Sequence, residues 1–161
     1  MNRTAAAFLL IAVLTGLLAA LGIAVELKGY AFGALGVARL DGLASAATFV
    51  PLAAIYAFAA VLMMILPLRA ASFVMASAAT PVFSATLVLF ATIVAVQAAR
   101  FSFGNRGALS LLLDWQFLFA GAIVAAHLAM NELRRNVLLR TVFFVVFVAA
   151  TLACLFWTFR L

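Results

Sequence analysis

The chain has 161 residues, of which 70% are hydrophobic and 9% charged, and its formal net charge is +6. Soluble domains are roughly half apolar and a quarter charged, so this composition predicts an integral membrane protein. No long polar segment interrupts the apolar runs, which leaves no room for a soluble catalytic or receptor domain. The basic residues stand singly or in pairs and form no stripe, which excludes a nucleic-acid-binding protein. Almost all of them are arginine, and together with the abundant alanine this favours a protein of the bacterial inner (cytoplasmic) membrane.

The apolar runs predict an all-α fold in a single transmembrane domain over residues 1–161. A helical crossing needs about 20 apolar residues. On that rule we expect about five spans, at roughly 5–25, 46–68, 77–99, 109–131 and 137–159. The boundary between the second and third spans is the least determined, because Arg69 is the one full charge between them. Four spans with a re-entrant or interfacial helix are the alternative.

The first apolar segment resembles a signal peptide, with Arg3 before an apolar core and the small residues Ala20 and Gly22 near its end. We interpret it instead as the first transmembrane helix. The connection over residues 26–45 is rich in glycine, so we expect an irregular or partly helical segment at one membrane face. Its charges are expected to form two local pairs, Glu26 with Lys28 and Arg39 with Asp41.

A turn is expected at Pro67, since proline lacks an amide donor and disfavours helix in the residue before it. Residues 71–80 then either lengthen the third helix or form a short interfacial piece. Residues 100–107 are expected to form an interfacial hairpin. The last connection is so short that the fourth and fifth spans must be antiparallel neighbours. With five spans, the basic residues divide evenly between the two sides of the membrane. Only the cluster of arginines near residue 135 favours a cytoplasmic N-terminus.

Three polar residues of the fourth span are the strongest functional lead: Asp114, Gln116 and His127, the only histidine. On an ideal helix Gln116 and His127 share a face, whereas Asp114 lies about 140° around and about 20 Å along the axis from His127. Asp114 and His127 therefore cannot form an acid–base dyad on this helix. If Ser110 caps the helix, Asp114 falls near its first turn, where a carboxylate complements the helix dipole.

Each of the two titratable residues has an ordinary and a functional interpretation. Asp114 is expected to be an interfacial acid near Arg100 or Arg106, or else an ion or proton site. His127 is expected to bond a carbonyl or a neighbouring helix, or else to bind a cofactor as a ligand to haem or to chlorophyll-type magnesium. With a single histidine, such a cofactor requires a partner chain or a five-coordinate site.

Small residues four apart predict close helix packing. They occur as Ala91, Ala95 and Ala99 on the third span and as Gly121 and Ala125 on the fourth. The last span is apolar all round and is expected to face lipid, pigment tails or another subunit.

No catalytic motif and no metal-binding cluster of carboxylates is present in the sequence. The single cysteine, Cys154, cannot form an intramolecular disulfide. An enzyme is therefore disfavoured.

The first hypothesis is a non-catalytic accessory or structural subunit of a larger bacterial membrane complex of respiratory, photosynthetic or transport type, with the lipid bilayer and other subunits as partners. The alternative is a small transporter or channel assembled from copies of the chain. An intramembrane lipid-modifying enzyme is a third hypothesis, but it lacks a credible nucleophile.

Overall fold

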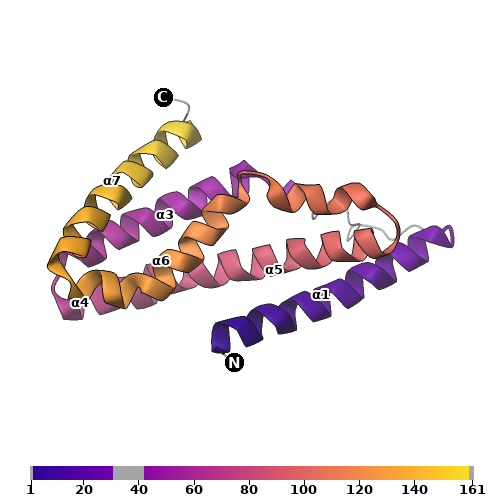
Figure 1. Ribbon diagram of the computed structural model, residues 1–161, viewed down its shortest axis with the longest axis horizontal. Helices are drawn as coiled ribbons and strands as arrows, with labels where there is room; N and C mark the ends of the chain where they lie inside the picture. Colours follow the sequence, from indigo (N-terminus) through magenta and orange to yellow (C-terminus); the bar gives the residue numbers. More distant parts are fainter. Residues whose placement is uncertain (1, 31–41, 160–161) are drawn as a thin grey trace. The chain divides into compact units, whose positions relative to one another are not determined.

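The computed structural model describes residues 2–30 and 42–159, and every regular element within them is helical (Figure 1). The helices are α1 (Arg3–Leu27), α3 (Ala46–Ile65), α4 (Leu68–Val74), α5 (Thr80–Ser102), α6 (Phe117–Arg135) and α7 (Val137–Phe159). A π-helical segment (Met75–Ala79) precedes α5 and a 3-10 helix (Arg106–Leu113) precedes α6. The predicted all-α membrane fold is confirmed. The proposed pair of Arg39 with Asp41 lies outside the described residues.

Four helical segments are long and apolar enough to cross a membrane: α1, α3, the continuous run Leu68–Ser102, and α7. The 3-10 helix and α6 pass the same test only together, as a bent pair. The described chain thus has four or five candidate spans, and it is a multi-pass membrane protein in contact with the lipid bilayer.

The expectation of one unbroken helix over 109–131 is not met. The 3-10 helix ends at Leu113, Asp114 has extended backbone (φ −67, ψ 144), and α6 begins only at Phe117. The polar side chains at the break find partners outside a helix: the Gln116 amide donates to Asp114 Oδ2 (3.2 Å) and to the Ala44 carbonyl (3.4 Å). Such bonds compete with helical backbone pairing. The Ser110 hydroxyl donates to the Gly107 carbonyl within the 3-10 helix, so Ser110 is not the N-cap of α6.

The turn predicted at Pro67 is present, and residues 71–80 lengthen the third helix. α3 ends at Ile65, and Pro67 is the extended residue that precedes α4. From there the chain stays helical to Ser102, a run of 35 residues. Pro81 lies inside this run and removes one backbone donor. The π-helical turn just before it, where the Thr80 amide donates to the Met75 carbonyl, re-pairs the backbone near the proline.

The chain divides into two compact units, and α5 contributes to both. The first unit contains residues 1–45 and 87–117. In it, α1 packs along the later part of α5. The rings of Phe8 and Phe90 lie 6.0 Å apart, and Ala19 packs against Val96 and Ala99. Because residue numbers rise together along this contact, the two helices run parallel.

The second unit contains residues 46–86 and 118–161. In it, α3 and α7 pack side by side in opposite directions (Figure 1). At one end of the pair, Cys154 of α7 packs against Val50 and Ala54 of α3. At the other end, Arg140 Nε donates to the Met64 carbonyl at 2.6 Å. Side chains of α3 are buried along much of its length, from Phe49 to Met64, so α3 is the central helix of this unit.

Candidate functional site

A side-chain hydrogen bond between helices of the second unit is centred on His127 of α6. Its Nδ1 lies 3.3 Å from the hydroxyl oxygen of Tyr56, which α3 supplies. On one face the imidazole stacks on the ring of Phe83, near the start of α5, with centroids 4.2 Å apart and planes 12° apart. The rings of Tyr56 and His127 also meet in an edge-to-face arrangement, with centroids 6.0 Å apart. Three helices thus hold one histidine side chain.

The surroundings determine which chemistry this cluster supports. Tyr56 is 2% exposed and Phe83 is 9% exposed, whereas His127 is only partly buried. The bond holds the ring orientation in either neutral tautomer: Nδ1 accepts from the Tyr56 hydroxyl when the proton is on Nε2, and donates to the hydroxyl oxygen when the proton is on Nδ1. No described residue bonds Nε2, and only the tautomer with the proton on Nδ1 leaves a lone pair at Nε2 for a metal. The prediction of a cofactor ligand at His127 therefore has a candidate ligand atom, and it stays a prediction.

Sequence reasoning missed Tyr56 and Phe83. They lie far from His127 in sequence, and Tyr56 is 71 residues away. Tyr56 carries a local signal, because a tyrosine in the middle of an apolar span needs a hydrogen-bond partner for its hydroxyl. Phe83 is one of sixteen phenylalanines and carries none.

Asp114 belongs to the first unit and His127 to the second, and each has its own partners. The exposed Asp114 carboxylate accepts from the Gln116 amide. Together with Arg100 and the buried Gln97 it lines an open hollow of about 450 Å³. Asp114 thus shares this hollow with the guanidinium of Arg100, which lies in the last turn of α5. The alternative prediction of an ion or proton site at Asp114 is left to experiment.

The five residues predicted to mediate helix packing fall into two groups. Ala91, Ala95 and Ala99 are buried, and Ala95 and Ala99 face α1. A Cβ at Gly16 would lie 3.7 Å from the Ala95 Cβ, so the two backbones approach closely there. Gly121 and Ala125 are exposed, and nothing lies within 4 Å of a Cβ built at Gly121. The described residues therefore show no close helix contact at Gly121.

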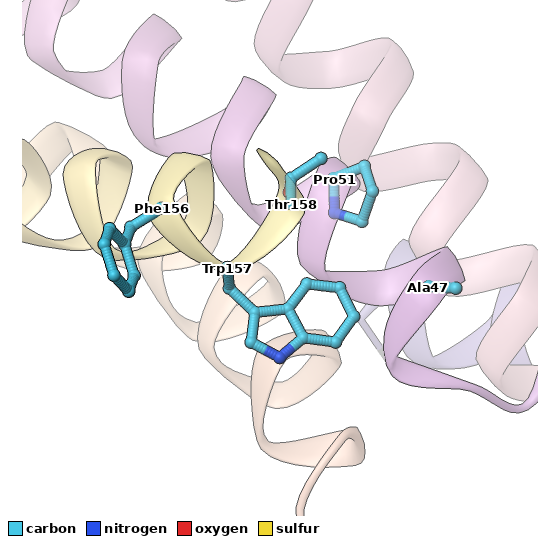
Figure 2. A pocket seen from close by; sticks show the side chains of 5 residues that line it. All are labelled: Ala47, Pro51, Phe156, Trp157 and Thr158. Atoms are coloured by element: carbon cyan, nitrogen blue, oxygen red, sulfur yellow. The ribbon is translucent and has the colours of Figure 1, made fainter. Parts of the chain in front are cut away.

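A second hollow lies at the end of the α3 and α7 pair that contains Cys154 (Figure 2). Its volume is about 500 Å³. It is lined by Phe156, Trp157 and Thr158 of α7 and by Ala47 and Pro51 of α3. The Thr158 hydroxyl already donates to the Cys154 carbonyl at 2.7 Å. The lining is therefore mostly apolar and offers van der Waals contact rather than polar recognition.

Most hydroxyls in the helices bond their own backbone. Each of the following donates to the carbonyl four residues earlier: Thr15, Ser77, Thr86, Thr141 and Thr151. Such bonds satisfy a hydroxyl in a low-dielectric environment without making a polar path between helices.

Fold and site together define a multi-pass helical membrane protein with one hydrogen-bonded histidine between its helices. The chain matches no family model, no curated protein and no solved structure.

Proposed function

We propose that this protein is a non-catalytic accessory subunit of a larger complex in the bacterial inner membrane. The observation that carries the proposal is the exposure of α1. Within this 25-residue helix only Ala19 and Gly22 are buried. The helix is anchored along one narrow stripe, and the rest of its apolar surface is available to lipid or to a partner helix.

The exposed side of α1 has the pattern of a helix-packing seam. Leu10, Leu14, Leu17 and Leu21 follow one another at intervals of four, three and four residues. They are 62%, 54%, 65% and 58% exposed. On an ideal helix they lie within about 60° of one another, on the side opposite Ala19. Leucines at this spacing interdigitate with the side chains of a second helix.

The locally satisfied hydroxyls support a role in packing. A transport path or an active site needs polar groups that face one another, whereas Thr15, Thr86 and Thr151 bond their own helices. A subunit that acts by packing against partner helices and shaping lipid access needs no such groups.

The proposal is tested by purifying the protein from its native membrane in mild detergent and identifying the chains that remain with it. We expect other polypeptides to co-purify with the wild type and to be lost with L14A/L17A. The matched control L118A/L128A removes two leucines of α6 that are also exposed, 73% and 54%, and should retain the partners. A chain that purifies alone would contradict the proposal. An absorption spectrum of the same sample reports any pigment at His127.

A small transporter or channel assembled from copies of the chain is the second candidate. It is favoured by the Tyr56–His127 hydrogen bond, because ionisable side chains between membrane helices often serve proton relays. It predicts flux in liposomes that hold the protein alone, reduced by His127→Ala or by Asp114→Asn. Flux that survives both changes would remove these residues as coupling sites.

A further inference from the structure

A third hollow, of about 740 Å³, lies in the second unit where α3 ends and α7 begins. Three arginines line it: Arg134 and Arg135 from the last turn of α6, and Arg140 from the first turn of α7. Asn131 adds an amide from the preceding turn of α6. The rest of the lining forms an apolar wall that includes Ile65 and Leu68, which flank the break at Pro67.

The positive charge at this hollow is poorly neutralised by the protein. Glu132 is the only acid among the described residues of the second unit. It pairs with Arg135 at 3.7 Å, but both side chains are largely exposed, 75% and 80% respectively. Exposed pairs of this kind are weak. Arg134 makes no hydrogen bond or ion pair with any residue that the structure describes.

Arg140 is held in place by the protein itself. Its Nε donates to the Met64 carbonyl at 2.6 Å, which satisfies one of the last carbonyls of α3. The bond uses one of the five guanidinium donors and fixes the plane of the group. The two terminal amino groups remain to bind an anion, and the guanidinium fork matches the geometry of a phosphate.

The apolar wall distinguishes the kinds of anion that fit. Ile65 is 58% exposed and Leu68 is 78% exposed, beside the arginines. An inorganic phosphate ion would leave this surface uncovered, whereas a phospholipid would place its phosphate on the arginines and its acyl chains along the isoleucine and leucine. The hollow also lies at the ends of candidate spans, where headgroups are found.

We propose that the hollow lined by Arg134, Arg135 and Arg140 is a binding site for the phosphate headgroup of an anionic phospholipid. Arg140 is its fixed element, Arg134 and Arg135 supply the additional charge, and Ile65 and Leu68 contact the acyl chains. The site does not depend on the existence of partner subunits.

The test compares lipid retained by the full-length protein after transfer from mixed phosphatidylcholine and phosphatidylglycerol vesicles into detergent, with native mass spectrometry as the readout. The variant R134Q/R135Q removes two charges from the hollow but keeps Arg140 and its bond to α3. The control R3Q/R106Q removes two arginines that are equally close to helix ends in the first unit. Thermal unfolding in phosphatidylcholine alone checks that both variants fold.

We expect R134Q/R135Q to lower retention of phosphatidylglycerol about tenfold or more, because a hydrogen bond to a charged group contributes on this scale. R3Q/R106Q should retain it like the wild type. Equal losses in both variants would reduce the effect to overall charge and overturn the site. Displacement of the lipid by inorganic phosphate alone would assign the site to free phosphate and overturn the lipid proposal.

Discussion

At the scale of single residues, His127 contacts a neighbouring helix, as its sequence position suggests, through a partner that the sequence does not identify. Sequence spacing places it one turn from the polar end of its helix and predicts a bond to a carbonyl or a neighbouring helix. The structure supplies the partner from α3, the Tyr56 hydroxyl, and adds the Phe83 ring on one face. Periodicity can say that a polar side chain lies within a span, but it cannot say which residue of another helix meets it.

Removing the Tyr56 hydroxyl should destabilise the second unit. In Tyr56→Phe the imidazole of His127 keeps its place but loses its partner at Nδ1, in surroundings that offer little water. We expect a loss of about 1 kcal/mol in the free energy of unfolding, since polar bonds between membrane helices contribute on this scale. Thermal or denaturant unfolding in detergent measures it.

The matched control is Tyr30→Phe, which removes a hydroxyl that is exposed to solvent, and it should leave stability unchanged. The double variant Y56F/H127F should lose less than the sum of its two single variants, because neither polar group is then left unpaired. Additive losses would show that Tyr56 and His127 do not interact.

At the scale of elements, sequence reasoning succeeds where helix boundaries are set locally. α7 begins at Val137, the start expected from sequence, because Asn136 caps it: its side-chain oxygen accepts from the Leu138 amide at 3.0 Å. Pro67 likewise acts locally, because proline lacks an amide donor and disfavours helix in the residue before it, and α3 ends at Ile65. The fourth span shows the opposite case, since part of what breaks it is the bond of Gln116 to Ala44, 72 residues away. No local pattern contains that information.

The packing of α1 on α5 predicts a steep size dependence at Gly16. A Cβ there meets the Ala95 Cβ at ordinary contact distance, 3.7 Å, so Gly16→Ala should be tolerated. Gly16→Leu would force the helices apart and should cost about 1–3 kcal/mol, the usual range for overpacking. Unfolding in detergent reports the difference.

Gly121→Leu is the matched control for Gly16→Leu, because Gly121 has open space around it. It should unfold like the wild type. Equal destabilisation by Gly121→Leu and Gly16→Leu would contradict this prediction. It would show that the cost of Gly16→Leu does not come from close packing of α1 on α5.

At the scale of the whole molecule, the contact between Arg140 and Met64 bears on the number of crossings. It places the start of α7 beside the end of α3, so the connections near residues 67 and 136 lie on the same side of the membrane. The chain between them must then cross the membrane an even number of times. The candidate span Leu68–Ser102 accounts for one crossing, and we expect the bent pair of the 3-10 helix and α6 to be the other. Of the two possible numbers of membrane spans, four and five, we therefore expect five.

Cysteine labelling of the intact protein in sealed membrane vesicles tests this topology most directly. After Cys154→Ser removes the native thiol, single cysteines at Leu68, Asn105 and Asn136 are treated with a membrane-impermeant maleimide. With five crossings, Leu68→Cys and Asn136→Cys are labelled from the same side and Asn105→Cys from the opposite side. Labelling of Asn136→Cys from the side of Asn105→Cys would mean that the bent pair does not cross, and it would contradict the five-span membrane fold.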